Sequence, residues 1–477
     1  MKASTKILGA KGILPVLAVI LALKLALLAV WSPILTPDSA DYFSYSSMIL
    51  SSRAWLHDAG IANTAISVSA YRMVGYPLLI SAARLLAGAG WAWLLASIQI
   101  GVSLIVLLRL CALQQPLRLP SGAMLFVLAA IATSSSLVLD NTMLTDSLHA
   151  SLVTLAIVAL LLPALSGRPL GLWAAFGVGL LLAAAFLLRE ALAYLWLPML
   201  PLLVLAVGVK RRFAVAIAAL LPLAVTIAGY SAWNKERTGT AFVTTGAQTV
   251  LLQPIVVSAS RYDPGIFFGD SPLDRAAQQT IKHHNFADVI RINRLLFSEF
   301  HMTGPQISAA VHHKYLASWR NHPRAMARMV LGNLRLNHQV FVLFRPIDAL
   351  REYILFATGR PCQLGRLKSV VADWRMLPIY LLSQLSRVVS ALLFAAFLFG
   401  TPWRVRREGL SSTTTRASLA VWLLYVGWYG GFAVVHLETR YMAPMLPFAV
   451  LFGTANLLWW RERRRGESHS VFGDVAA

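Results

Sequence analysis

Two aspartates, Asp38 and Asp41, follow the first long apolar run of the chain, where a membrane-spanning helix would end. Thr36 is a good helix cap and Pro37 suits the first helical position, so the pattern predicts that a new helix begins there. A spacing of three places both carboxylates on one face of that helix. A carboxylate held in this way can take a proton from a hydroxyl group. The ordinary alternative is that these acids offset the helix dipole and stay solvated.

Further charged groups stand at three other junctions between apolar runs. Ionisable side chains at membrane depth are costly, and they are usually paired or functional. An arginine there can hold a phosphate with two parallel hydrogen bonds. The ordinary alternatives are a helix-start acid and an interfacial ion pair beside an aromatic anchor. The junction residues are Asp146, then Arg189 and Glu190, then Glu438, Arg440 and Tyr441.

Apolar helices must position these groups. The 477 residues are 57% hydrophobic and only 13% charged, whereas soluble proteins carry about 25% charged residues. The apolar residues gather in runs of about twenty, which is the length that crosses a bilayer. The chain is therefore predicted to be an all-α polytopic membrane protein with about ten transmembrane helices. The predicted spans are 12–35, 91–113, 122–139, 147–166, 170–188, 191–209, 213–233, 377–400, 417–435 and 441–460.

The net charge of +22 follows the same topology. If the N-terminus is cytoplasmic, alternating spans place the basic clusters 210–212, 404–407 and 461–465 on the cytoplasmic side, as expected for short loops. No nucleic-acid partner is needed to explain them. The C-terminus is then cytoplasmic as well, and the acidic junctions open onto the outer face.

Four regions follow from the spans. Residues 1–233 form an N-terminal seven-span module with an outer loop, 36–90, in which one or two helices lie on the membrane surface. Residues 234–376 form an α-rich extracytoplasmic domain, residues 377–460 a three-span module, and residues 461–477 a basic cytoplasmic tail. Within the domain, 240–257 is β-like and the segments 273–299, 305–319 and 323–344 are helical. Its histidines, among them His283 and His284, lack a ligand pattern for metal.

Together the motifs resemble one family. The sequence Pro-Asp-Ser-Ala-Asp-Tyr after the first span and the segment Gly-Tyr-Pro-Leu-Leu that follows are similar to the polytopic glycosyltransferases of the GT-C superfamily. The likeness extends to Thr-Asp-Ser-Leu, Leu-Leu-Arg-Glu and Glu-Thr-Arg-Tyr-Met-Ala-Pro, and it is clearest over residues 1–235 and 417–460. The nearest branch is bacterial, with lipid A aminoarabinose and galacturonic acid transferases and relatives of protein mannosyltransferases.

This resemblance implies a multi-pass enzyme of the bacterial inner membrane and cell envelope, acting on the periplasmic face. It implies transfer of a hexose or pentose from a polyprenyl-phosphate donor to a glycolipid, polysaccharide or protein acceptor. Asp38 or Asp41 would be the general base or would position the acceptor, with Asp146 facing the same pocket. Some members use a divalent cation and others do not, and these three aspartates are the candidates to hold one. The groups expected to bind the lipid phosphate are Arg189 and Arg440, with Arg72 and Lys235 behind them.

Two other classes compete with a transferase. A secondary transporter or a lipid or glycan flippase also places charges among helices, but near the midplane and often in two repeated halves. A non-catalytic scaffold leaves the one-sided series of acids and arginines unexplained. The sequence has no Walker A, GxGxxG or GxSxG motif, so nucleotide binding has no support.

Overall fold

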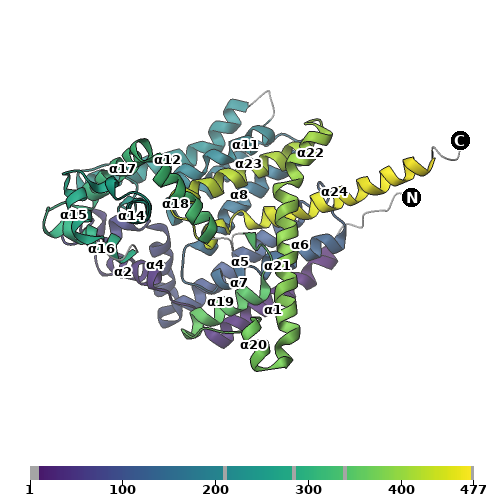
Figure 1. The fold of residues 1–477 in the computed structure, drawn as a ribbon, viewed down its shortest axis with the longest axis horizontal. Coiled ribbons are helices and arrows are strands. Elements are labelled where there is room, and N and C mark those ends of the chain that lie inside the picture. Colours follow the sequence, from purple (N-terminus) through teal and green to yellow (C-terminus); the bar gives the residue numbers. More distant parts are fainter. Residues whose placement is uncertain (1–9, 208–211, 282–285, 337–340, 474–477) are drawn as a thin grey trace.

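A computed structural model describes residues 10–207, 212–281, 286–336 and 341–473. Within these ranges every regular element is a helix, and the one β contact is an isolated bridge between Ile34 and Thr142. The helices form a broad bundle, and α24 (Leu446–Gly473) projects from it on the side away from α14 (Leu252–Arg261) and α17 (Gly304–Asn321) (Figure 1). The prediction of an all-α chain is confirmed.

Among the described residues, five helical stretches are long and apolar enough to cross a membrane. They are Gly12–Trp31, Gly75–Cys111, Asp146–Ser166, Arg212–Thr238 and Trp374–Glu408. Three shorter apolar helices are Ser121–Ala132, Leu172–Leu188 and Leu192–Ala206. These lengths and compositions are those of a helical membrane protein, and the larger count of about ten spans stays a prediction.

The chain passes from α1 (Ala10–Trp31) through a short connection into α2 (Pro37–Ser51), which begins where the sequence predicts. At this start the Ser39 hydroxyl accepts a hydrogen bond from the Thr36 N–H at 2.9 Å. Helix α2 packs against α4 (Gly75–Ala87). The other long or site-bearing helices up to residue 238 are α3 (Val68–Tyr71), α5 (Trp91–Cys111), α6 (Ser121–Ala132), α7 (Ser136–Leu139), α8 (Asp146–Ser166), α9 (Leu172–Leu188) and α12 (Arg212–Thr238).

Within the predicted span 191–209, the described residues 191–207 are largely helical, but the helix is not continuous. Pro198 and Pro201 lie near the starts of its second and third pieces, and proline has no N–H to continue a helical ladder. The short 3-10 piece between the two α-helices follows from these prolines. The three pieces are α10 (Leu192–Leu195), η3 (Leu197–Met199) and α11 (Leu200–Ala206).

The helices of 234–376 pack in two places. Helices α14 to α18 share a hydrophobic core of their own, which includes Ile255, Ile292 and Met326, and α13 packs against α14, α16 and α17. Helix α19 (Pro346–Thr358) instead packs against α1, α7 and α21. The members of the first group are α13 (Ala247–Val250), α14 (Leu252–Arg261), α15 (Pro272–Thr280), α16 (Phe286–Ser298), α17 (Gly304–Asn321) and α18 (Pro323–Leu336).

The β-like prediction for 240–257 is wrong, because α13 and most of α14 occupy this stretch. Leu252, Ile255, Val256 and Ala259 are all buried, and their spacing of three, one and three residues is that of one helix face. Tertiary packing of this face outweighs the β-propensity of the valines and isoleucine. The predicted helix 273–299 is divided into α15 and α16, and His283 and His284 lie outside the described residues.

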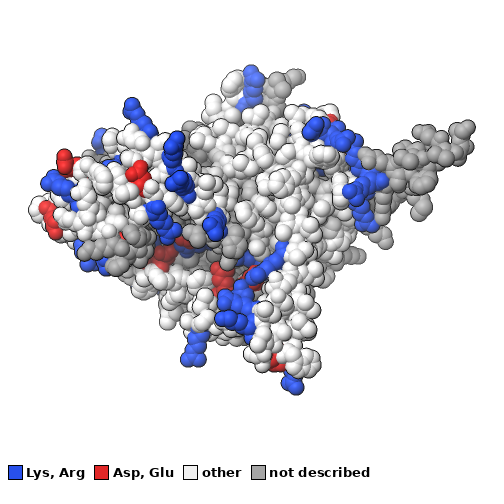
Figure 2. All heavy atoms as spheres, in the orientation of Figure 1, with Lys and Arg blue, Asp and Glu red and all other residues white. Residues whose placement is uncertain are grey.

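The C-terminal helices bring two basic clusters together. The carboxylate of Glu408 at the end of α22 accepts a hydrogen bond from Trp459 of α24. Lys and Arg side chains gather over this part of the surface (Figure 2). Arg404 and Arg463 both lie over the Trp459 ring, so members of the predicted clusters 404–407 and 461–465 lie close together, as the predicted common membrane face requires. The elements are α20 (Leu367–Ala372), α21 (Leu377–Leu398), α22 (Gly400–Glu408), α23 (Thr413–Ala433), η8 (Thr439–Met442) and α24 (Leu446–Gly473).

Close packing of α9 on α12 yields a stability prediction. A Cβ added at Gly179 would lie 2.7 Å from the Ala219 carbonyl oxygen and 2.7 Å from Pro222 Cδ. Gly179→Ala should therefore destabilise the protein by about 1–3 kcal/mol. A Cβ at Gly177 meets nothing within 4 Å, so Gly177→Ala should be neutral or stabilise by up to about 1 kcal/mol. The thermal unfolding midpoints of both variants in detergent test this prediction. Equal midpoints for Gly179→Ala and Gly177→Ala would contradict close packing of α9 on α12 at Gly179.

Candidate active site

One arginine joins the two aspartates of α2. Arg72 follows α3, and its Nε and Nη2 lie 3.0 and 2.7 Å from Asp41 Oδ2. The same Nη2 lies 3.2 Å from Asp38 Oδ1. Because the two acids are one helical turn apart, a single guanidinium reaches both. Burial opposes the charge of Arg72, but nearby tyrosines and the two aspartates raise its pKa.

A second ion pair joins the start of α8 to the end of α9. Asp146 opens α8 and is almost fully buried, and Arg189 Nη1 lies 2.5 Å from its Oδ1. Arg189 caps the C-terminus of α9, where a cation also offsets the helix dipole. Its guanidinium lies over the Tyr441 ring at 4.2 Å, within cation–π range. The junction residues of three predicted spans therefore meet at one place.

Arg440 of η8 connects these two pairs. Its Nη2 lies 3.1 Å from Asp38 Oδ2, its Nη1 lies 3.8 Å from Asp146 Oδ2, and its Nε lies 2.5 Å from Glu438 Oε2. Burial opposes the charge of Arg440, but Asp146 and Glu438 raise its pKa, so it stays a cation. One guanidinium thus links α2, α8 and the loop before α24.

Two cavities lie on either side of this network. The larger has a volume of about 400 Å³ and is lined by three arginines, Arg72, Arg189 and Arg440. The smaller has a volume of about 340 Å³ and is more apolar, with Val138, Leu139 and Phe356 in its wall. Both are in the range of small-molecule sites. Four residues line both cavities: Asp38, Leu144, Glu438 and Arg440.

The structure separates Asp38 from Asp41. Asp38 faces both cavities, whereas Asp41 lines neither of them and is held by Arg72. Asp146, Glu190 and Tyr441 line the larger cavity. Of the two aspartates of α2, Asp38 is therefore the one that a molecule in either cavity would contact.

One predicted residue lies elsewhere. Lys235 is exposed on α12 and lines neither cavity, so it is not grouped with the three arginines. Two residues further along, Arg237 turns inward and donates to the Ser69 carbonyl at 2.6 Å. A helix advances 100° per residue, so these neighbours on α12 face different surroundings. The prediction that Lys235 assists phosphate binding has no structural basis here.

His436 belongs to the site and was not predicted as a site residue. Its Nε2 donates to Glu438 Oε1 at 2.8 Å, and it lines the larger cavity. The sequence signal is its place in His-Leu-Glu-Thr-Arg-Tyr, two residues before the glutamate. Tyr42 and Tyr71 also line this cavity, each with its ring near Arg72.

The aspartates do not form a metal centre. Among the described residues, no three His, Cys, Asp or Glu side chains are grouped so that they could hold a metal ion. Asp38, Asp41 and Asp146 are each paired with guanidinium groups, whose positive charge disfavours a metal cation at the same carboxylates. Positive charge at this site comes from arginines, so the residues present do not fit a resident divalent cation.

Comparisons with known proteins do not assign this chain to a family. No family model matches it, and no curated protein or solved structure does. Its function is therefore inferred from the residues and cavities described above.

The Glu438 carboxylate has a testable acid dependence. Burial alone would raise its pKa, but His436 and Arg440 outweigh burial and lower the pKa to about 2 from an ordinary 4.5. A lowered folded pKa means that the ionised carboxylate stabilises the fold above pH 4.5, and that this contribution is lost as the pH falls towards about 2.

Glu438→Gln should remove that part of the acid dependence. Unfolding midpoints measured from pH 6 to pH 2 should therefore fall less steeply in the variant than in the wild type. Parallel curves for the two proteins would contradict a lowered pKa at Glu438.

Proposed function

We propose that this protein is a membrane glycosyltransferase that moves a sugar from a polyprenyl-phosphate donor to a glycolipid, polysaccharide or protein acceptor. One observation carries the proposal: the Asp38 carboxylate stands between two cavities, and the larger of them is lined by three arginines. In such a reaction two substrates have to meet at one base beside a cationic phosphate site. The two cavities, the Asp38 carboxylate and the three arginines support this requirement.

Asp38 would act on the acceptor. Its carboxylate takes the proton of the acceptor hydroxyl as the oxygen attacks the anomeric carbon of the sugar. The bond from acceptor oxygen to anomeric carbon forms, and the bond from anomeric carbon to phosphate oxygen breaks. The electron pair of the broken bond leaves with the lipid phosphate. Asp38 is partly exposed to the cavities, so a substrate hydroxyl can reach it.

The arginines would act on the donor. As the sugar leaves, negative charge grows on the lipid phosphate, and cations fixed in advance stabilise that charge without reorganising. Arg440 and Arg189 are held by carboxylates and by the Tyr441 ring, so their guanidinium groups are already oriented. Arg72 adds a third cation on the same wall. A guanidinium also matches phosphate oxygens geometrically, which an ammonium does not.

The finer architecture and location are part of this proposal. It assigns a GT-C-like fold of about ten spans to the chain, with both termini in the cytoplasm and the site on the outer face of a bacterial inner membrane. In support, the site residues lie at the ends of α8 and α9 and in the loop before α24. The basic clusters 404–407 and 461–465 lie together at the other end of α24.

A transporter or flippase is the main rival function. Such a protein would move a lipid-linked sugar through the cavities without forming a covalent product. A labelled-donor assay on purified protein in detergent separates the two functions, because only a transferase produces labelled acceptor. Movement of donor across a proteoliposome membrane without labelled acceptor would favour the rival.

Replacing the proposed base tests the chemistry. Asp38→Asn keeps the shape of the side chain but cannot take a proton at neutral pH, so kcat for sugar transfer should fall by about 10²–10⁴-fold. Asp58→Asn is the matched control, because Asp58 is exposed and lines neither cavity. The control should keep wild-type kcat. Full activity of Asp38→Asn would remove Asp38 from the reaction.

Replacing a phosphate-binding arginine tests the donor site. Arg440→Lys keeps the charge but loses the planar fork, so KM for the lipid-phosphate donor should rise by about tenfold. Arg84→Lys is the control, because Arg84 hydrogen-bonds to Ser47 at 2.9 Å and lines neither cavity. Steady-state kinetics with varied donor measure both variants. An unchanged donor KM in Arg440→Lys would remove Arg440 from the donor site.

A further inference from the structure

A buried lysine in the first apolar helix has no part in the chemistry proposed above. The Lys24 side chain on α1 is 0% exposed, and it forms an ion pair with Asp140, which is 2% exposed. Its Nζ also lies 3.3 Å from Ser136 Oγ and 3.5 Å from Ser103 Oγ. Charges withdrawn from water in this way persist when they are paired and hydrogen-bonded. The pair therefore holds α1 to the start of the 140–146 segment.

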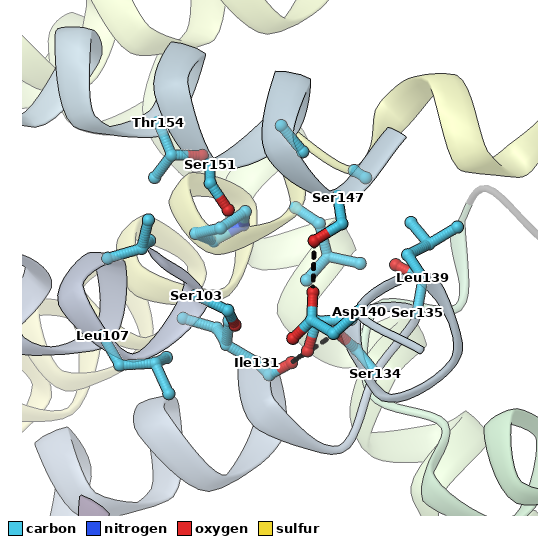
Figure 3. A pocket seen from close by; sticks show the side chains of 16 residues that line it. Ser103, Leu107, Ile131, Ser134, Ser135, Leu139, Asp140, Ser147, Ser151 and Thr154 are labelled. Atoms are coloured by element: carbon cyan, nitrogen blue, oxygen red, sulfur yellow. Dashed lines mark hydrogen bonds between the residues drawn. The ribbon is translucent and has the colours of Figure 1, made fainter. Parts of the chain in front are cut away.

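The cavity beside Asp140 is not a substrate site. It has a volume of about 50 Å³, which holds water but not a sugar or a phosphate group. Its wall is rich in hydroxyls, and Asp140 is the one ionisable side chain among its lining residues. Figure 3 shows several of the side chains that carry these hydroxyls, namely Ser103, Ser134, Ser147, Ser151 and Thr154.

From this cavity, hydrogen bonds lead to the start of α8. Ser147, which follows Asp146, donates to Asp140 Oδ1 at 2.6 Å (Figure 3). Gln99 Nε2 donates to the backbone carbonyls of Asp140 and Thr142 at 3.0 and 3.1 Å. Asp140, at the start of the 140–146 segment, is therefore bonded to Ser147, the residue that directly follows Asp146 at the end of the segment.

The same segment also holds the start of α2. The Ile34 N–H donates to the Asn141 carbonyl at 2.8 Å, and the Met143 N–H donates to the Ile34 carbonyl at 2.9 Å. The Ser39 hydroxyl donates to the Met143 carbonyl at 2.8 Å. Ser39 follows Asp38 directly. Asp146 is thus the last residue of the 140–146 segment, and Asp38 is next to a residue that is bonded to it. Lys24 and Asp140 hold this segment in the protein interior.

We infer that the Lys24–Asp140 ion pair positions Asp38 and Asp146 relative to each other. Neither residue touches a substrate; each acts through the 140–146 segment. The inference rests on the proposed transferase function where activity is measured. Misplacing reacting groups by about 1 Å can lower a rate by up to 10²-fold, so a loosened segment should be visible in kcat.

A double variant separates positioning from stability. Lys24→Met or Asp140→Asn alone leaves one buried charge without its partner and should lower the thermal midpoint. Lys24→Met/Asp140→Asn removes both charges, so the midpoint should return close to that of the wild type. A positioning role predicts that kcat nevertheless stays about tenfold low, with donor KM within about twofold. Amide hydrogen exchange over residues 34–42 and 141–147 should also be about tenfold faster.

The matched control is the ion pair between Lys314 of α17 and Asp274 of α15, which are 2.5 Å apart. It joins the same two residue types, and neither residue lines the two large cavities. Lys314→Met/Asp274→Asn should keep wild-type kcat and wild-type exchange over residues 34–42. If the Lys24→Met/Asp140→Asn variant also keeps wild-type kcat, the positioning role is overturned.

If the double variant does not fold, Ser147→Ala decides, because it leaves the ion pair intact and removes only the bond from Asp140 to α8. It should lower kcat by about tenfold at an unchanged donor KM, and wild-type kcat would overturn the role. If the wild-type protein itself forms no product, the transferase proposal fails. The positioning role is then decided by amide hydrogen exchange over residues 34–42 alone. Wild-type exchange rates in Lys24→Met/Asp140→Asn would overturn that role.

Discussion

Arg440 holds carboxylates that reach it from three separate parts of the chain: Asp38 on α2, Asp146 at the start of α8, and the nearby Glu438. The Asp146 side chain is almost fully withdrawn from water, and the other two are partly so. Removing the partner of a buried charge typically costs about 3–5 kcal/mol. This one guanidinium therefore contributes to the relative placement of α2, α8 and η8, and it lines both of the cavities beside it.

The same electrostatics prepare the site for an anion. Asp146 and Glu438 keep Arg440 charged in spite of its burial, and Arg189 is stacked on Tyr441 while it is paired with Asp146. The cations are therefore oriented in advance, which is the condition under which fixed charges would best stabilise the leaving phosphate of the proposed reaction. Asp38 remains partly exposed among these cations, so one carboxylate stays within reach of a substrate. The carboxylate proposed as the base and the guanidinium groups proposed to bind the phosphate are thus adjacent in one network at the helix ends.

Much of this could be predicted from the sequence, because charged residues at the ends of apolar runs are rare and stand out. Asp38, Asp146, Arg189 and Arg440 were found in this way, and topology predicted that they face one side. The pairing pattern could not be predicted, since Asp38 and Arg440 are 402 residues apart. Lys235 was grouped with the arginines by its place in the chain, but α12 turns it outward.

Two other features depend on tertiary packing in the same way. Asp140 stands among the outer-face acids in the sequence, yet its partner is Lys24, 116 residues earlier and inside the protein. Residues 240–257 have the β-branched composition of a strand, but one helical face of Leu252, Ile255 and Val256 packs in the core of α14 to α18. The composition of this stretch predicts a strand, which is wrong, whereas the spacing of its buried residues is that of a helix.

A structure determined with a bound polyprenyl phosphate tests the central claim most directly. The account predicts that the phosphate lies in the larger cavity, within hydrogen-bond distance of Arg440 and of at least one of Arg189 and Arg72. It also predicts that the Asp38 carboxylate faces the position of the departing sugar. A phosphate bound away from all three arginines would contradict the account.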